Sequence, residues 1–161
     1  MLHPTQIIAE EGQHTIFIER KFDARPEQLF TLFTEADLFI QWSKPDNTTL
    51  EVKSMNCQTG GSFLWHHIHA NGSRFSFYGV YHEVLSPKSI IRTSEFRGLP
   101  DKLLPVLEVL QFEPMQDQQT KLSITIYCPH EAYRDSMLNS GMQAHFDHSF
   151  ALLDTLLKSF N

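Results

Sequence analysis

The sequence predicts an α+β protein in which a curved antiparallel sheet of six or seven strands wraps around one long C-terminal helix, with two short helices after the first strand. Three observations lead to this prediction. Residues 15–22 alternate in the manner of a strand, residues 48–127 contain short extended segments separated by turns, and residues 138–160 carry a helical apolar stripe. Short strands at this spacing are typical of an antiparallel meander packed against a helix.

The N-terminal part of the chain is expected to form a strand followed by helices. In the segment 15–22, successive residues fall into two alternating sets that contain β-branched and aromatic side chains, a pattern that favours a strand. Asp23, followed by Pro26 and Glu27, is a typical helix start, because an acidic residue can cap the first turn and proline is accepted there. The two short helices share an apolar stripe made of Leu29, Phe30, Phe33 and Leu38, and the helical pair is expected to end at Trp42.

The middle of the chain follows a period of two residues. Extended segments are expected at 48–54, 62–70, 73–85, 90–96, 106–112 and 121–127. Asn71-Gly72 is a strong hairpin signal between two of them, since both residues accept the positive φ angles of a tight turn. Gly60-Gly61 breaks the pattern before a new strand, and a loop containing proline is expected over 99–105.

A long amphipathic helix is predicted at the C-terminus. From Leu138 the apolar residues recur at intervals of three and four, at Met142, Phe146, Phe150, Leu153, Leu157 and Phe160. Gly141 interrupts this stretch and indicates either a kink or the start of the helix. Because one face of an antiparallel sheet has to be buried, we expect the helix to cover it.

Composition excludes several classes of function. Acidic residues outnumber basic ones by 19 to 13, and lysine and arginine form no run, so no nucleic-acid partner is expected. No apolar run approaches the roughly 20 residues of a membrane span, and the first residues lack a signal-peptide pattern. Cys57 and Cys128 follow no CxxC spacing and are expected to be free thiols. We therefore expect one cytoplasmic domain over 1–161, with an ordered core at about 15–160.

The predicted arrangement raises the question of what fills the space between sheet and helix. A sheet of six or seven strands is wider than one helix, whose diameter is about 10–12 Å. The chain contains 13 Phe, 4 Tyr and 2 Trp, and such side chains either fill a core or line a pocket for an apolar ligand. The geometry of the elements is compatible with both outcomes.

Five stretches of the sequence resemble one protein family. They are FDARPEQLF at 22–30, GGSFLW at 60–65, GVYHEVLSPKSII at 79–91, TKLSITI at 120–126 and SGMQAHFDHSFALLDTLL at 140–157. In this order and spacing they are similar to homologues of the heat-shock-protein-90 ATPase activator, a group within the START-like (SRPBCC) superfamily of helix-grip domains. The resemblance implies the helix-grip fold for residues from about 15 to 160.

The same resemblance implies three alternatives for function, because one fold serves several activities in this superfamily. Its members include binders of hydrophobic ligands, polyketide cyclases and dehydratases, and modules that activate a chaperone ATPase. For this chain we expect the first: binding of a small hydrophobic or aromatic molecule, without catalysis and without a cofactor. A chaperone is the partner that the third alternative implies.

The residues expected to line a pocket come from the helices and the central strands. His67 shares a strand face with Phe63 and Trp65, because side chains alternate along a strand, and the same period places Glu83 on the face of Tyr81. His67 and Glu83 are the expected polar anchors. The predicted ligand-binding residues are Trp42, Phe63, Trp65, His67, Phe77, Tyr81, Glu83, Met142 and Phe146.

The polar anchors also define the catalytic alternative. A cyclase or dehydratase needs an acid–base pair within reach of its substrate, and a desolvated glutamate has a raised pKa suited to that work. His67 and Glu83 are the candidates for such a pair.

The histidines suggest a metal site only weakly. His67 and His69 stand at i and i+2 of a strand, and a third ligand would have to come from His82, His145 or His148. On the C-terminal helix, His145 falls on the flank of the apolar stripe and His148 points away from it. Because no motif such as HExxH is present, no metal is expected.

Overall fold

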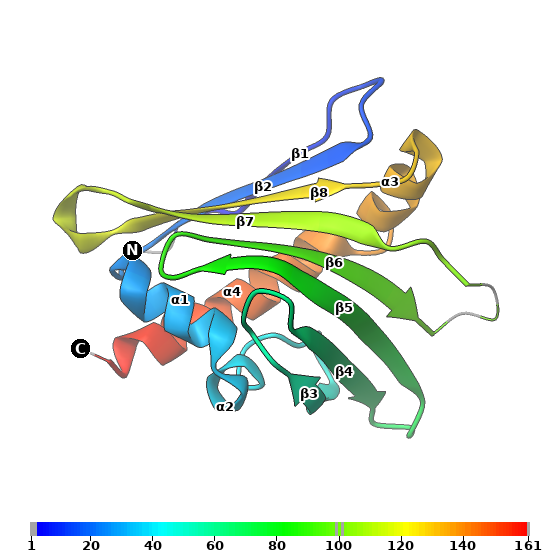
Figure 1. Ribbon diagram of the computed structural model, residues 1–161, viewed down its shortest axis with the longest axis horizontal. Coiled ribbons are helices and arrows are strands. Elements are labelled where there is room, and N and C mark those ends of the chain that lie inside the picture. The colour runs from blue at the N-terminus through cyan, green and yellow to red at the C-terminus, as the bar shows by residue number, and fades with distance from the viewer. Residues whose placement is uncertain (1–2, 99, 101, 161) are drawn as a thin grey trace.

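The computed structural model describes residues 3–98, 100 and 102–160, and it is built on one antiparallel sheet of eight strands (Figure 1). The strand order is β1-β2-β8-β7-β6-β5-β4-β3. The α+β fold with a large antiparallel sheet and a C-terminal helix is therefore confirmed. The strand number is slightly higher than the expected six or seven, since a three-residue strand also pairs at the edge beside β2.

The strands are β1 (Gln6–Ile8), β2 (Thr15–Phe22), β3 (Thr48–Met55), β4 (Ser62–His69), β5 (Arg74–Leu85), β6 (Ser89–Arg97), β7 (Val106–Pro114) and β8 (Thr120–Tyr127). The helices are α1 (Pro26–Thr34), α2 (Ala36–Phe39), α3 (Glu131–Leu138) and α4 (Met142–Lys158), with a 3₁₀ turn η1 at Gln116–Gln118. The expected loop over 99–105 follows β6, and its residues Leu99 and Asp101 lie outside the described residues.

The start of α1 differs from the expectation. The helix begins at Pro26, and the residue before its first turn is Arg25, not Asp23. The carboxylate of Asp23 instead contacts His3 Nε2 at 3.0 Å and accepts a hydrogen bond from Gln119 Nε2 at 2.8 Å. The prediction that Asp23 caps a helix is therefore wrong, because its carboxylate binds the N-terminal segment and the β7–β8 connection.

The C-terminal helix α4 begins directly after Gly141, whose φ of 88° lies in the left-handed region that glycine accepts without strain. The preceding helix α3 ends at Leu138, so the glycine marks a helix start and not a kink. At the other end, Phe160 lies beyond the helix with 46% of its surface exposed. Its expected place on the apolar stripe is therefore wrong.

Helix α4 packs its apolar stripe against the inner face of the sheet, which it crosses obliquely from α3 toward the C-terminus (Figure 1). Phe150 meets Phe22 of β2 edge to face, with ring centroids 5.3 Å apart, and Leu153 is fully buried. Arg20, also in β2, donates to Asp154 of α4 from Nη1 at 3.0 Å and from Nη2 at 2.6 Å. The helix is thus held to the sheet by aromatic packing and by a two-pronged ion pair.

Strand β5 contains a β-bulge that changes which side chains face the interior. Tyr81 lies opposite Arg92, but Glu83 lies opposite Ile91, so one extra residue, His82, is accommodated between them. The bulge turns Glu83 to the outer face of the sheet, where it is exposed. The prediction that Glu83 shares the inner face with Tyr81 is therefore wrong.

Gly79 provides the room that an aromatic side chain needs on the inner face of β5. A Cβ atom at this position would lie 1.9 Å from the carbonyl oxygen of Thr93 and 2.5 Å from the ring of Phe63. The ring of Phe63 therefore packs directly against the backbone of β5, a close approach that only glycine permits.

Two further expectations concern the chain as a whole. Cys57 is partly exposed and Cys128 is buried, and both are free thiols, as expected. Within the described residues, no helix combines the length and the apolarity needed to cross a membrane.

Candidate functional site

The inner face of β4, β5 and β6 carries a continuous aromatic surface. Trp65 and His67 of β4 lie opposite Phe77 and Phe75 of β5, and Phe77 in turn lies opposite Phe96 of β6. Side chains of directly opposed residues share one face of a sheet. The register therefore brings three of the predicted site residues, Trp65, His67 and Phe77, onto one surface.

Part of the predicted lining is packed into the core. Trp42, Phe63 and Tyr81 are 4%, 0% and 0% exposed. The ring of Phe63 stacks on that of Trp65 with centroids 4.0 Å apart, and the indole N–H of Trp42 donates to the carbonyl of Leu32 at 2.8 Å. At this end of the interior, aromatic side chains fill the space between the sheet and the helices.

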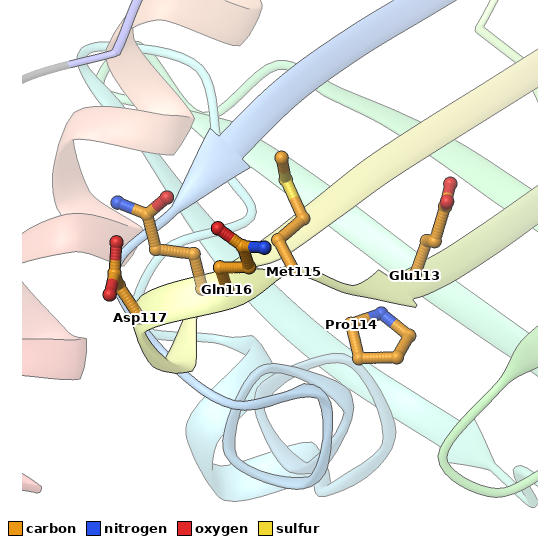
Figure 2. A pocket seen from close by; sticks show the side chains of 6 residues that line it. Glu113, Pro114, Met115, Gln116 and Asp117 are labelled. Carbon is orange, nitrogen blue, oxygen red and sulfur yellow. The ribbon is translucent and has the colours of Figure 1, made fainter.

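Two surface hollows lie elsewhere. One is at the hairpin between β7 and β8, lined by residues 113–117 and Gln119 (Figure 2). The other lies beside the β4–β5 turn and is lined by Asn47, His69, Ala70, Asn71 and Ser73. Both are open depressions, and neither includes a residue that the sequence predicted to bind a ligand.

The aromatic surface is covered only in part where α4 begins. Phe75, Phe77 and Phe96 lie on the inner face of the sheet and are nevertheless partly exposed, as are His145 and Phe146 of α4. The ring centroids of Phe77 and Phe96 are 5.4 Å apart. We call these five residues the open end of the interior. Solvent therefore reaches aromatic rings at the open end, whereas the aromatic rings at the opposite end of the interior are buried.

The two predicted site residues of α4 lie near its start. Met142 is 8% exposed, and Phe146, one turn later, is partly exposed with its ring 5.3 Å from that of Phe150. Phe146 thus continues the buried aromatic stripe of α4 toward the open end.

Two histidines bring polar atoms to the open end. His67 is 4% exposed, and its ring stacks parallel to that of Phe75 with centroids 4.8 Å apart. Burial, together with the charges of His145 and His69, lowers the pKa of His67 to about 4. Burial, and to a smaller extent the charge of His148, also lowers the pKa of His145. Both imidazoles are therefore neutral at pH 7, and neither Nδ1 has a hydrogen-bond partner among the described residues.

Further along the same inner face lies a buried polar cluster. Arg92 of β6 stands opposite Tyr81, and its Nε is 3.4 Å from Oε1 of Glu108 on β7. Its guanidinium carbon is 5.3 Å from the ring centroid of Trp65 and 5.7 Å from that of Phe63, a cation–π arrangement. Arg92 Nη1, Tyr81 Oη and Trp65 Nε1 are buried without hydrogen-bond partners among the described residues.

The protonation states in this cluster follow from its surroundings. Burial raises the pKa of the Tyr81 hydroxyl, so tyrosine stays neutral and keeps its proton. Burial alone would lower the pKa of Arg92, but Glu108, Tyr81 and Cys57 together outweigh burial, and the net pKa is raised. Arg92 therefore remains a cation and Tyr81 a neutral hydrogen-bond donor.

Sequence reasoning missed Arg92 and Glu108. The signal for Arg92 was nonetheless present, because it occupies an inward position of β6 between Ile90 and Ser94, at the period of two that buries Ile90 completely. A charged residue at an inward strand position is rare unless it is paired. Finding its partner requires the register of β6 with β7, which places Glu108 directly opposite.

The structure separates the two residues that the catalytic alternative requires as an acid–base pair. His67 faces the interior and Glu83 faces outward beyond the bulge, so the two side chains lie on opposite faces of the sheet. The expectation that they act together on a substrate is therefore wrong. Among the described residues, no group of three or more His, Cys, Asp or Glu side chains is arranged to hold a metal ion.

Comparison with known proteins places this geometry in context. The family model described as "Activator of Hsp90 ATPase homolog 1-like protein" matches residues 23–158, and no curated protein matches the chain. A Rhodobacter sphaeroides protein of known structure is similar with a TM-score of 0.86 and 20% identity, over 98% of this chain and 99% of that one. Protein Ms6760 from Mycobacterium smegmatis has a TM-score of 0.85 and 16% identity, over 96% of this chain and 97% of that one. An AHSA1 protein from Silicibacter pomeroyi has a TM-score of 0.75 and 17% identity, over 91% and 99%.

Proposed function

The chain belongs to the family of activator of Hsp90 ATPase homolog 1-like proteins, and from that membership we propose that it binds a small apolar or aromatic molecule at the open end, without catalysis. The observation that carries the proposal is the partial exposure of Phe75, Phe77 and Phe96 on the inner face of the sheet. A contiguous apolar surface left accessible on a folded protein is typical of a binding site.

The physical basis is the burial of aromatic surface. A flat ligand between the sheet and the start of α4 would remove the partly exposed rings of Phe77, Phe96 and Phe146 from water, at about 25 cal/mol per Å² of apolar area. The rings of Phe77 and Phe96 meet at an interplanar angle of 61°, which presents both a face and an edge to an aromatic guest. Of the residues predicted to line a pocket, His67, Phe77, Met142 and Phe146 lie at or beside the open end. The buried residues of the predicted lining pack in the core next to it.

Ligand binding is expected to raise the stability of the protein. With naphthalene as the probe, a free concentration ten times its Kd should add about 1.4 kcal/mol to the free energy of unfolding, because only the folded state binds it. Thermal unfolding followed by tryptophan fluorescence, with and without naphthalene, measures the effect. Phe77→Ala should weaken naphthalene binding about tenfold, since it removes one aromatic wall.

Tyr78→Ala is the matched control for Phe77→Ala. Tyr78 is the next residue of β5, is also aromatic and partly exposed, and lies on the outer face. Equal losses of naphthalene affinity in the two variants would contradict a site on the inner face. Extraction of the protein purified from its own cells, followed by mass spectrometry of what is released, would identify the natural ligand.

The family description supports a second candidate, an interaction module that modulates the ATPase of heat-shock protein 90. We expect such a module to change the ATP turnover of the chaperone from the same organism when added in equimolar amount. A turnover rate that stays unchanged under a tenfold molar excess of this protein would remove this candidate.

We also propose that the protein acts in the cytoplasm as a single domain and without a cofactor. The free thiols of Cys57 and Cys128 suit a reducing compartment. The net charge of −6 disfavours nucleic acid and anionic membrane surfaces as partners.

A further inference from the structure

We propose that the ligand of the open end is amphipathic and carries an uncharged hydroxyl group, which lies in the hollow beside the β4–β5 turn. The inference rests on the proposed function and adds a second, polar part to the same site, together with the chemical class of the ligand. We call this depression the turn hollow, and its lining residues are Asn47, His69, Ala70, Asn71 and Ser73.

The turn hollow begins where the aromatic surface ends. His69 lines the hollow and, like His67, points to the inner face of β4, because the two residues are two positions apart in one strand. The ring centroid of His69 is 5.4 Å from that of Phe75, which belongs to the open end. A ligand whose rings lie on Phe75 and Phe77 therefore reaches the hollow along the accessible surface, without entering the filled core.

The spacing along the chain sets the length of the ligand. Phe77 and Ser73 are four residues apart, which corresponds to about 13 Å in an extended chain, and Phe75 lies midway between them. Two fused aromatic rings followed by a short polar chain span this interval. The volume of the hollow, about 460 Å³, lies within the range of roughly 300–1,000 Å³ that is common for small-molecule sites.

Local hydrogen bonds hold the polar walls of the turn hollow in place. Asn71 Oδ1 accepts hydrogen bonds from Ser73 N at 2.9 Å and from Ser73 Oγ at 2.7 Å. On the other wall, Asn47 has a φ of 60° and donates its backbone N–H to Asp46 Oδ1 at 3.0 Å. Because the backbone of both walls is already fixed, binding a ligand orders few additional groups.

The chemistry of the lining favours a group that both donates and accepts hydrogen bonds. Carboxamide, hydroxyl and neutral imidazole side chains each provide donor and acceptor atoms, and a ligand hydroxyl can use both. A carbonyl would only accept, and an ammonium group would only donate. A hydroxyl therefore matches the side chains of Asn47, His69 and Ser73 better than either.

The absence of ionised side chains favours an uncharged group. Among the described residues, those that line the hollow include no Lys, Arg, Asp or Glu. Arg74 is a neighbour in the sequence, but it stands opposite Ile68 on the outer face of the sheet. A ligand carboxylate or ammonium group would lose part of its hydration in the hollow without gaining an opposite charge.

Three naphthyl ethers of matched shape test the inference. They are 2-(2-naphthyloxy)ethanol, which has a hydroxyl, 2-propoxynaphthalene, which has a methyl group in its place, and 2-naphthyloxyacetate, which has a carboxylate. Isothermal titration at pH 8, at which imidazole is uncharged, should give a Kd for 2-(2-naphthyloxy)ethanol about fivefold lower than that for 2-propoxynaphthalene. The Kd for 2-naphthyloxyacetate should exceed that for 2-(2-naphthyloxy)ethanol.

Two variants assign this preference for the hydroxyl to the turn hollow. His69→Phe keeps a ring beside Phe75 and removes both ring nitrogens. Asn47→Gly removes a carboxamide and preserves the backbone, because glycine accepts a φ of 60° without strain. Each should reduce the preference to about twofold or less. Both residues are exposed, so neither substitution disturbs the core, and the Kd for 2-propoxynaphthalene should stay nearly unchanged.

The matched controls are His82→Phe and Gln118→Gly. His82 is exposed at the bulge of β5, and Gln118 is exposed in the turn η1 with a φ of 56°. Each repeats the chemical change of one test variant at a position that does not line the turn hollow. Both should retain the full preference for 2-(2-naphthyloxy)ethanol.

Each other outcome overturns a distinct claim. If none of the naphthyl ethers binds, the proposed function fails together with the inference. If 2-propoxynaphthalene binds the wild-type protein as tightly as the alcohol, the apolar site stands and the hydroxyl is overturned. If 2-naphthyloxyacetate binds most tightly, the group is an anion and the uncharged ligand is overturned. If the alcohol is preferred equally in the wild type and in both test variants, the turn hollow is overturned as its site.

Discussion

Replacing Arg20 with methionine is expected to lower the free energy of unfolding by about 3–5 kcal/mol, the range found when one partner of a buried ion pair is removed. The Arg20 side chain is 4% exposed and donates to both oxygens of Asp154, whose side chain is 16% exposed. Methionine has similar length but cannot donate, so the Asp154 carboxylate would be left partly buried without its partner. Urea unfolding followed by tryptophan fluorescence measures the loss.

Two further variants serve as controls for Arg20→Met: Arg97→Met, at an exposed ion pair, and a double variant that also removes the partner of Arg20. Arg97 is 52% exposed and forms an ion pair with Glu95 at 3.2 Å, so its loss should cost no more than about 1 kcal/mol. In Arg20→Met/Asp154→Leu the buried charge is removed as well, and most of the lost stability should return. If Arg20→Met costs as little as Arg97→Met, the ion pair does not anchor α4 to β2.

Acidification from pH 6.5 to pH 4 is expected to remove about 3 kcal/mol of stability through His67 alone, since one pKa unit corresponds to about 1.36 kcal/mol. In the folded protein its pKa is lowered from 6.5 to about 4 by burial and by the charges of His145 and His69. Over this range the unfolded chain binds the proton and the folded chain does not. The contribution of His67 to stability is therefore fully present above pH 6.5. It decreases as the pH falls and is lost below pH 4.

Unfolding by urea at a series of pH values between 4 and 7 tests this dependence. His67→Phe keeps a ring to stack on Phe75 and removes the titrating group, so its stability should fall less steeply with acidification. A part of the slope should remain, because the pKa of His145 is lowered by burial as well. The control is His82→Phe at the exposed bulge, which should keep the full slope, and equal slopes in both variants would contradict the assignment to His67.

Much of the fold could be predicted because local patterns recur in the structure. The alternation in 15–22 corresponds to β2, Asn71-Gly72 lies in the turn between β4 and β5, and Gly141 precedes the first residue of α4. Each of these signals depends on neighbouring residues only: side chains alternate along a strand, and glycine accepts a positive φ. Residues that share an uninterrupted strand, such as Trp65 and His67, were accordingly placed on the correct face.

The candidate site was less predictable because its residues are related across strands. His82 adds one residue to β5, and this single bulge reverses the face of Glu83 while the sequence keeps its period of two. Arg92 occupies an inward position, but its partner Glu108 is 16 residues away in the sequence and is identified only by the register of β6 with β7. No local sequence pattern indicates how far a helix extends over a sheet.

By itself, then, the sequence determined the order and type of most elements, the family, and the amphipathic faces that bring sheet and C-terminal helix together. It did not indicate the short edge strand β1 or the separate helix α3. The tertiary structure alone decided which part of the aromatic interior is filled and which part stays accessible. The physical reason is that partial exposure of Phe77 and Phe96, and the burial of Arg92 without a partner for Nη1, depend on where α4 starts and on how adjacent strands align. These are relations between segments distant in the chain, and they arise only when all of the strands have paired.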